Sequence, residues 1–364
     1  MNKMKLGDIL EIQPKSKRKA GEGIINGKYP FYTCSNELTK SINTADYEGD
    51  ALIMGTGGMA SIHYEKGKFS TSTDCLVYKS NKNVNLSLIN KYLRTNIYLL
   101  ENGFKGAGLR HISRDYISNI TIPLPERNLQ DKIVTELDLI EKTITNHNDV
   151  LKKYDTLIKS RFIEMFGDEP VENRKWKVEK LGTVCSKITD GTHKTPSYQH
   201  QGITFISAKN IIDGKIDLSD VKHITKDEYA VIQKRCNLEK GDVLLTKSGS
   251  LGSTAIFNLD IPVGLFESLA ILKYDKNLIN GVFLKETLQC DSCKRQFANA
   301  EKGIAIKHLH LNVISNTRIP VPPIELQQQF AAFVQQIDKS KFAVQKSLEK
   351  AETLYKSLMQ EYFG

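Results

Sequence analysis

The segments IPLPERNLQ (Ile122–Gln130) and IPVPPIELQ (Ile319–Gln327) lie 197 residues apart in a chain of 364 residues and share the pattern Ile-Pro-x-Pro followed by Leu-Gln. Sliding the chain by this distance aligns residues 106–167 with residues 303–364 without a gap, and 21 of the 62 positions are identical. Unrelated sequences of average composition would share about 6% of their positions. The chain therefore contains an internal duplication.

The repeat continues upstream with looser spacing. KLGDIL at Lys5 corresponds to KLGTVC at Lys180, and GDALIMGTGG at Gly49 corresponds to GDVLLTKSGS at Gly241. Strand-like runs such as DALIM, DCLVY, GITFIS, DVLLT and LAILKY alternate with glycine turns and with helical stretches such as LSLINKYLRTNIYLLENG. Each half therefore predicts a lobe of mixed α/β structure.

Each half ends in a pattern typical of a long amphipathic helix. Apolar residues recur at steps of three, four and seven from Leu129 to Met165 and from Leu326 to Leu358, with no Gly or Pro inside. The prolines before each pattern keep the preceding strand extended and stop the helix from starting earlier. Such a narrow stripe favours a coiled-coil seam over two ordinary core helices, so we expect the two helices to pair with each other.

The predicted fold class is α+β, with two mixed α/β domains joined by two long antiparallel helices and related by a pseudo-two-fold repeat. The expected boundaries are 1–125 for the first domain, 126–168 for the first helix, 169–322 for the second domain and 323–364 for the second helix. The polar segment GDEPVENRKWK is interpreted as the linker into the second lobe.

Composition narrows the classes of protein. With 40% apolar and 26% charged residues, the chain can bury two cores. It has no run of about 18 apolar residues and its first residues lack the apolar core of a secretion signal, so we expect a cytoplasmic protein without a membrane partner. Cys290 and Cys293 form a lone CxxC, which lacks the other ligands of a structural zinc, so reduced thiols are expected. The net charge of +9 favours a polyanionic partner such as nucleic acid, although proteins that bind none also carry such an excess.

The known catalytic motifs are missing. GDVLLTKS (Gly241–Ser248) approaches a phosphate-binding loop, but Thr246 stands in place of the second glycine. GTGG (Gly55–Gly58) lacks the spacing and following helix of a dinucleotide or adenosylmethionine site, and VPPI (Val321–Ile324) lacks the polar and aromatic ends of a base amino-methyltransferase motif. The eight histidines form no tight metal cluster. We therefore expect no catalytic residue, metal or cofactor in this chain.

Candidate binding residues lie in loops. PKSKRKAG carries four cations that suit contact with backbone phosphates: Lys15, Lys17, Arg18 and Lys19. TDGTHKTPSY offers donors and acceptors for base edges: Asp190, Thr192, His193 and Lys194. The pairs Arg110-His111 and Lys307-His308 occupy equivalent places before the last strand of each lobe, which suggests a shared role; an ordinary surface pair is the alternative.

Together these motifs resemble the specificity subunit of type I DNA restriction-modification systems. The resemblance spans essentially the whole chain and is carried by IPLPERNLQDKI and IPVPPIELQQQF, GDALIMGTGG and GDVLLTKSGSLG, TDGTHKTP and FISAKNI (Phe205–Ile211). It implies two target-recognition domains, each reading one half of a bipartite double-stranded DNA site, separated by two antiparallel helices. The same motifs place Thr56, Lys247 and Ser248 among the expected DNA contacts.

The resemblance also implies partners. Two methyltransferase subunits would use S-adenosylmethionine to methylate adenine, and restriction subunits driven by ATP and Mg would join the complex, whereas this chain would bind no cofactor. The chain departs from the family pattern because it is short and its first lobe has no counterpart to TDGTHKTP.

Residues and resemblance predict the same mechanism. Two unequal lobes on a rigid spacer can read an asymmetric split sequence from the major groove, while cations on the flanks fix the register through phosphates. Two alternatives remain. A stand-alone DNA-modifying enzyme, either a nuclease or a methyltransferase with an unfamiliar site, predicts activity from the isolated chain. A coiled-coil protein adaptor without DNA binding predicts no salt-dependent affinity for DNA.

Overall fold

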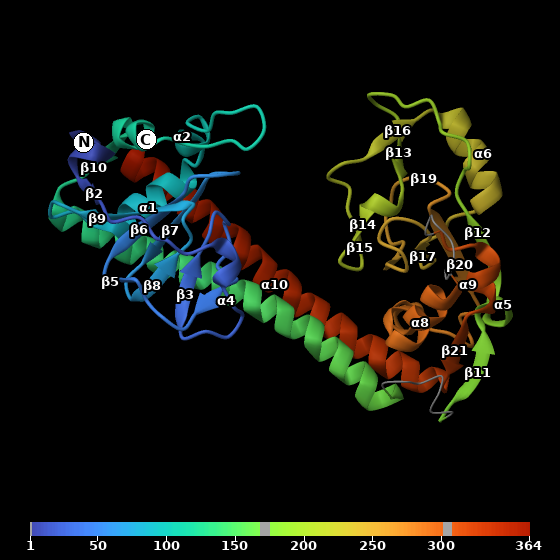
Figure 1. The fold of residues 1–364 in the computed structure, drawn as a ribbon. Coiled ribbons are helices and arrows are strands. Elements are labelled where there is room, and N and C mark those ends of the chain that lie inside the picture. The colour runs from blue at the N-terminus through green and yellow to red at the C-terminus, as the bar shows by residue number, and fades with distance from the viewer. Residues whose placement is uncertain (1, 168–174, 301–307) are drawn as a thin grey trace. The chain divides into compact units, whose positions relative to one another are not determined.

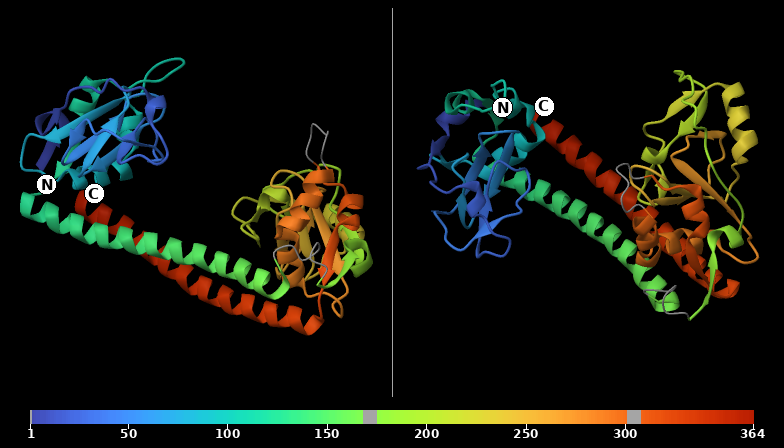
Figure 2. Two further views of the ribbon diagram at one scale, coloured as in Figure 1. Left: turned by 60° about the horizontal axis from the view of Figure 1, so that its bottom comes forward. Right: turned by 45° about the vertical axis from the view of Figure 1, so that its right-hand side comes forward.

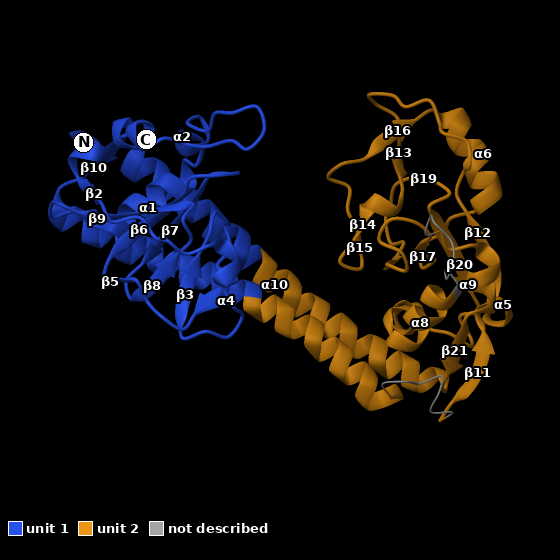
Figure 3. Cartoon of the chain, in the orientation of Figure 1, with its two compact units in different colours: residues 1–148, 346–364 blue, residues 149–345 orange. Residues whose placement is uncertain are grey.

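The computed structural model describes residues 2–167, 175–300 and 308–364. The chain forms two compact units, one of residues 1–148 with 346–364 and one of residues 149–345 (Figure 3). Each unit contains one lobe and one segment of each of the two longest helices. Part of the expected linker GDEPVENRKWK, residues 168–174, lies outside the described residues.

Two 40-residue helices, α4 (Arg127–Phe166) and α10 (Ile324–Phe363), follow the two Ile-Pro-x-Pro segments. The prolines themselves lie in or directly after the short strands β10 (Thr121–Leu124) and β21 (Arg318–Val321). At 1.5 Å per residue each helix is about 60 Å long. Within each unit, a segment of α4 (green) lies beside a segment of α10 (red) in the views of Figures 1 and 2.

Side-chain contacts give the direction of the two helices within each unit. In the first unit, the hydroxyl of Tyr355 donates to Glu141 Oε1 at 2.8 Å, and Tyr362 contacts Glu136. A rising residue number on α4 therefore meets a falling number on α10, which is antiparallel pairing. In the second unit, the same direction follows from Lys341 Nζ, which lies 2.5 Å from Asp155 Oδ1, and from the rings of Phe162 and Phe330, whose centroids lie 5.6 Å apart.

The first lobe is built on two four-stranded sheets, with strand orders β2-β9-β6-β7 and β4-β3-β8-β5, and a two-stranded sheet β1-β10. Its elements are β1 (Asn2–Lys5), η1 (Leu6–Asp8), β2 (Leu10–Ile12), η2 (Ala20–Glu22), β3 (Tyr29–Tyr32), β4 (Ser41–Ile42), β5 (Tyr47–Glu48), β6 (Ala51–Gly55), β7 (Ser61–Glu65), β8 (Lys68–Thr71), β9 (Cys75–Ser80), α1 (Leu86–Thr95), α2 (Tyr98–Glu101) and α3 (Arg114–Asn119). Strand β6 is buried along its whole length. Its Leu52 shares one core with Leu93 of α1, Leu137 of α4 and Met359 of α10, so lobe and helix segments form one folded body.

The second lobe contains a four-stranded sheet β12-β20-β17-β18, a three-stranded sheet β16-β13-β19, and the pairs β11-β21 and β14-β15. Its elements are β11 (Lys177–Lys180), α5 (Leu181–Val184), β12 (Cys185–Asp190), β13 (Ile203–Ile206), η3 (Ala208–Asn210), β14 (Ile211–Ile212), β15 (Lys215–Ile216), β16 (Lys222–Ile224), α6 (Lys226–Cys236), β17 (Val243–Thr246), β18 (Thr254–Ile256), β19 (Val263–Leu265), β20 (Leu269–Tyr274), α7 (Gly281–Gln289), α8 (Asp291–Ala300) and α9 (Leu311–Asn316). Phe283 of α7 packs between Phe162 and Phe166 of α4 and Phe330 of α10. Lobe and helix segments are therefore joined here by aromatic rings.

Small contacts recur at equivalent positions of the two lobes. Lys5 Nζ donates to Asn119 Oδ1 at 3.0 Å, and Lys180 Nζ donates to Asn316 Oδ1 at 2.9 Å. Both join the first strand of a lobe to the short helix before the Ile-Pro-x-Pro strand. In the parts of the chain that the structure covers, none of the helices combines the length and the apolar character needed to span a lipid bilayer.

Candidate nucleic-acid interface

Asp190 is the last residue of strand β12, where Ala270 of β20 is its partner across the ladder. The next residue, Gly191, lies where the chain passes close to β19. A Cβ at this position would lie 2.1 Å from the carbonyl oxygen of Leu265, so only glycine fits. The side chain of Asp190 is 2% exposed. We expected Asp190 to meet base edges from an open loop; the structure instead places it at the end of a strand, with its carboxylate buried in the lobe.

The Asp190 carboxylate lies at the centre of a charged cluster. Oδ2 accepts a hydrogen bond from Lys247 Nζ at 2.6 Å, and Oδ1 accepts one from Arg235 Nη2 at 2.6 Å. His193 Nε2 lies 3.2 Å from Oδ2. Burial by itself raises the pKa of Asp190, but the hydrogen bonds from Lys247 and Arg235 outweigh it and hold that pKa below its usual range.

Lys247 follows strand β17, and its side chain is 3% exposed. Its ammonium lies 2.6 Å from Asp190 and 3.5 Å from Glu267 Oε2. We expected Lys247 to contact DNA; in the structure its ammonium is buried between two carboxylates at the base of the lobe's charged cluster. A buried charge of this kind persists because it is paired.

An open cavity of about 840 Å³ lies over this cluster. Its lining comes from the loop after β12, the last turn of α6, the turns after β17 and β19, and the segment at α9: Asp190, His193, Arg235, Lys247, Glu267, His308, His310, Leu311 and Asn312. Four of the residues predicted from sequence meet here: Asp190, His193, Lys247 and His308. Side chains of His193, Arg235 and His308 remain partly exposed at the cavity.

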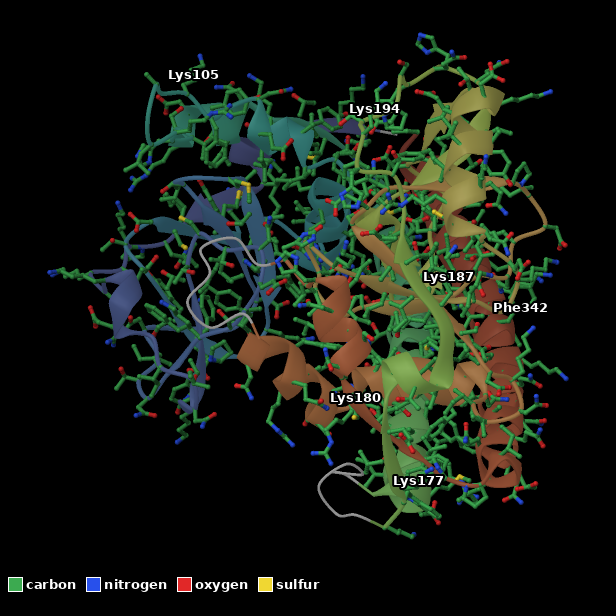
Figure 4. The ribbon with its side chains drawn as sticks, turned by 90° about the vertical axis from the view of Figure 1, so that its right-hand side faces the viewer. Lys105, Lys177, Lys180, Lys187, Lys194 and Phe342 are labelled. Carbon is green, nitrogen blue, oxygen red and sulfur yellow. The ribbon has the colours of Figure 1, made fainter. Side chains whose placement is uncertain are left out.

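The remaining predicted residues of the second lobe lie around this cavity or cannot be placed. The Thr192 hydroxyl forms hydrogen bonds with the backbone of Lys194. The backbone N–H of Thr192 donates to Leu265 O at 2.9 Å, so Thr192 shapes the loop. Lys194 is exposed on that loop, with Lys187, Lys180 and Lys177 on β12 and β11 below it in Figure 4. Ser248 is half-buried in the turn after β17. Lys307 lies outside the described residues.

In the first lobe, Arg18 holds one loop against another. Its Nε and Nη2 lie 2.5 and 2.7 Å from the two carboxylate oxygens of Asp46, and Nη2 also donates to Thr44 Oγ1 at 2.8 Å. The hydrogen bond from Arg18 holds the pKa of Asp46 below its usual range. The expected contact of Arg18 with phosphate stays a prediction, and in the structure its guanidinium is paired with a carboxylate. The neighbours Lys15, Lys17 and Lys19 are exposed.

Thr56, Arg110 and His111 come together at one end of strand β6. The Thr56 hydroxyl is turned inward and donates to Asp74 O at 2.8 Å, whereas His111 Nδ1 lies 3.2 Å from Thr56 O. Arg110 Nη2 donates to Phe104 O at 3.0 Å. Arg110 and His111 are exposed on the loop that leads to Lys105, which Figure 4 shows at the edge of the lobe. Of the three, Arg110 and His111 are therefore placed to meet a ligand, and Thr56 supports them through its backbone.

The two lobes share the backbone contact that holds these segments. Ile112 N donates to Thr56 O at 3.1 Å, and Leu309 N donates to Lys247 O at 2.8 Å. Ile112 and Leu309 are 197 residues apart and each follows the histidine of a cation-His pair. The duplication thus places His111 and His308 next to the turn that follows the central strand of each lobe.

Sequence reasoning missed five residues that line the cavity: Arg235, Glu267, His310, Leu311 and Asn312. His310 has a signal, since it stands two residues after His308 in the segment HLH. Arg235 and Glu267 belong to no motif and are brought to Asp190 and Lys247 by the tertiary fold. Among the described residues, no group of three or more His, Cys, Asp or Glu side chains is arranged to hold a metal ion.

Residues 1–153 and 173–352 of this chain match the family described as Type I restriction modification DNA specificity domain. Over 387 aligned residues the chain is 23% identical to the type I restriction enzyme MjaVIII specificity subunit of Methanocaldococcus jannaschii, covering 98% of this chain and 90% of that protein. It is 28% identical over 166 residues to the EcoBI specificity subunit of Escherichia coli, covering 44% of this chain and 35% of that protein.

Solved structures have the same fold. The crystal structure of a type I restriction-modification system S subunit from M. genitalium superposes with a TM-score of 0.69 at 14% identity, covering 100% of this chain and 96% of that one. A chain from a structure on complex assembly and conformational transition of the type I R-M system gives a TM-score of 0.53 at 17% identity, covering 100% and 97%. The family match spans both lobes and most of both long helices, and it confirms the resemblance that the paired motifs indicated. The chain therefore belongs to the type I restriction modification DNA specificity domain family.

Proposed function

We propose that this chain is the non-catalytic specificity subunit of a type I complex and that each lobe reads one half of a split, asymmetric double-stranded DNA site. The observation that carries the proposal is the shared contact of the lobes, Ile112 N to Thr56 O and Leu309 N to Lys247 O, which sets His111 and His308 beside the central strand of their lobes. The exposed lysines Lys15, Lys17, Lys19 and Lys194 are suited to phosphate contacts that fix the register. The surroundings of the two histidines differ between the lobes, which is what an asymmetric target requires.

The long helices are proposed to form an antiparallel coiled coil that binds two methyltransferase subunits and sets the distance between half-sites. Leu157 on α4 and Leu354 on α10 are equivalent in the repeat, and their side chains are 44% and 50% exposed. Large apolar side chains left open at equivalent points favour a protein partner that binds in two copies. Each leucine lies in a different compact unit, so each unit offers one copy of this surface.

The cofactors of the complex are proposed to reside on its other subunits. S-adenosylmethionine would bind the methyltransferase subunits, and ATP with Mg would bind the restriction subunits. The position of the described glycine-rich segments supports this proposal. They lie in turns between strands, such as Gly55–Gly58 at the turn from β6 to β7, and not at the start of a helix whose N–H groups could hold a phosphate.

The test is to express the chain with the methyltransferase subunit of its system and to map methylated adenines in cellular DNA. A split asymmetric motif is expected, and replacing residues 1–125 by those of a relative with another target should change one half only. Methylation or cleavage of DNA by the purified chain alone would favour a stand-alone enzyme. A complex without salt-dependent DNA affinity would favour a protein adaptor.

A second experiment tests the helix surface. Leu157→Asp and Leu354→Asp should each reduce the number of bound methyltransferase subunits from two to one, as measured by native mass spectrometry, and the double variant should bind none. Ile163→Asp is the matched control, because Ile163 is an exposed apolar residue of α4 whose repeat equivalent is the polar Gln360. An unchanged stoichiometry in the double variant would rule out this surface.

A further inference from the structure

We infer that Glu267 reads an exocyclic amino group of a base, cytosine N4 or adenine N6, in the half-site of the second lobe. We also infer that the buried Asp190–Lys247 pair is the device that positions it. The inference rests on the proposed function, because it assigns residues to base reading within the second lobe.

Glu267 is the acceptor that the cavity presents to a ligand. Its side chain is 22% exposed, on the turn after β19, and Oε2 lies 3.5 Å from Lys247 Nζ and 3.6 Å from His308 Nε2. Within the described residues, Oε1 makes no hydrogen bond. An ionised carboxylate accepts hydrogen bonds at both oxygens, so Glu267 keeps an acceptor for a ligand donor. In the major groove, Glu and Asp accept from cytosine N4, and adenine N6 is the other amino donor there.

The charges of the cavity favour a base edge over a phosphate. Among the charged side chains that the structure describes at the cavity, two carboxylates, Asp190 and Glu267, balance two cations, Lys247 and Arg235. An electrostatic contact of Lys or Arg with phosphate gains most from a cation that no carboxylate already balances. A base edge instead needs acceptors and donors side by side, and here the Glu267 carboxylate lies near partly exposed His308, His193 and Arg235 side chains.

The buried Asp190–Lys247 pair holds Glu267 and Arg235 in place. Lys247 Nζ lies 2.6 Å from Asp190 and 3.5 Å from Glu267, and Asp190 also lies 2.6 Å from Arg235 Nη2. The side chains of Asp190 and Lys247 are only 2% and 3% exposed, so they support the more exposed groups of the cavity from below. They act as positioning residues, because a recognition group must be held within a fraction of an ångström to discriminate between bases.

The test uses the full chain with its methyltransferase subunit and compares wild type with Glu267→Leu, which removes both acceptor oxygens, in methylome mapping and in DNA-binding competition. At one position of the second half-site, discrimination in favour of cytosine or adenine should fall about 5- to 150-fold in the variant, while the first half-site stays unchanged. Oligonucleotides that lack the amino group separate the two bases: 2-pyrimidinone replaces cytosine and purine replaces adenine at that position. Removing the correct amino group should weaken wild-type binding by the same factor and leave the variant unaffected.

Three further variants test whether Glu267 itself reads the base. Glu267→Asp should keep the base identity with reduced discrimination. Asp190→Asn should relax several positions of the second half-site, because Glu267, Arg235 and His193 all lose their support. Glu239→Leu is the matched control: Glu239 is a carboxylate of the same lobe that pairs with Lys273 and is not among the residues that line the cavity, so its replacement should change no position.

An active Glu267→Leu variant with an unchanged second half-site overturns the inference, as does a uniform loss of affinity for all sequences. Should Glu267→Leu fail to fold, as judged by circular dichroism, Glu267→Asp with the amino-deleted oligonucleotides decides the question. The wild-type chain reports the proposed function separately. A wild type without any split methylated site would overturn that function and this inference together, whereas a wild-type split site unaltered by Glu267→Leu overturns this inference alone.

Discussion

Gln130 and Gln327, the last residues of the two repeated segments, are both buried and make the same two hydrogen bonds. Gln130 Nε2 donates to Pro125 O at 2.8 Å, and its Oε1 accepts from the backbone N–H of Asn85 at 2.8 Å. Asn85 in turn caps the start of α1. One amide therefore joins the proline turn before α4 to the start of the first helix of the lobe.

The second half repeats this arrangement. Gln327 Nε2 donates to Pro322 O at 2.8 Å, and Oε1 accepts from the backbone N–H of Asn280, the N-cap of α7, at 2.9 Å. A buried backbone group without a partner costs free energy, so both halves depend on the amide. This is a physical reason for Leu-Gln to stand at the end of both segments.

Replacing Gln327 by Ala should lower the free energy of unfolding by about 1–3 kcal/mol, because the Asn280 N–H and the Pro322 carbonyl lose their partner. Gln130→Ala should do the same in the first unit. The control is Gln328→Ala, an exposed neighbour, which should stay within about 0.5 kcal/mol of wild type. Urea unfolding followed by circular dichroism measures the free energy of unfolding of all three variants. Equal values would show that the buried amide does not stabilise the protein.

The Asp190–Lys247 pair predicts a pH dependence of stability. The pKa of Asp190 is lowered in the folded state, so the pair stabilises fully above the unfolded value of about 3.9, and this contribution is lost as pH falls through the lower folded value. Asp190→Asn should therefore cost about 3–5 kcal/mol at pH 7 and progressively less in acid. Unfolding free energies at pH 7 and pH 3 measure the difference, and a cost independent of pH would contradict the ion pair.

The length of the two long helices is predicted to set the spacing between the half-sites. Inserting one heptad after Asn148 and one after its repeat equivalent Gln345 keeps the apolar seam and lengthens each helix by about 10 Å. The spacer should grow by up to about three base pairs at 3.4 Å each, with both half-site sequences unchanged. Methylome mapping of the lengthened chain with its methyltransferase is the measurement, and an active variant with the original spacer would contradict the prediction.

Cys34 is predicted to be the reactive thiol of the first lobe. The hydrogen bond from the Cys75 thiol, helped by the N–H groups of Gly57 and Thr56, lowers the pKa of Cys34 although burial opposes it. The Cys34 thiol donates to the carbonyl of Asp74 at 2.9 Å, a contact that favours the neutral thiol and opposes this lowering of the pKa.

Alkylation of Cys34 by iodoacetamide should therefore rise with an inflection below the usual thiol value of about 8.5, and Cys75→Ala should move the inflection upward. Cys185 provides the internal comparison, because burial raises its pKa to about 12 and it should remain unmodified in the folded protein. Peptide mass spectrometry across pH 5–9 reads both sites. Equal rates at Cys34 and Cys185 would contradict the assignment.

Much of the architecture was predictable because it depends on local patterns. Uninterrupted apolar periodicity after Pro125 and Pro322 indicates long helices, and the runs DALIM and LAILKY indicate strands that the structure contains as β6 and β20. The helical stretch predicted from Leu86 is interrupted at Asn96, between α1 and α2, since Asn96 leaves the helical region of backbone angles. Residue patterns determine such elements because each hydrogen bond or apolar step lies within one or two turns.

The sequence by itself also determined the duplication, the family, and the presence of Asp190, His193, Lys247 and His308 among the candidates. Only the tertiary structure decided their roles. Strand β12 runs on to Asp190 because β20 pairs with it, and this pairing buries a carboxylate that a Thr-Asp-Gly segment presents as a turn residue. Arg235 and Glu267 then reach that carboxylate and Lys247 from distant points of the chain. Burial and charge pairing depend on which groups the fold brings within about 4 Å, and no spacing in the sequence encodes that distance.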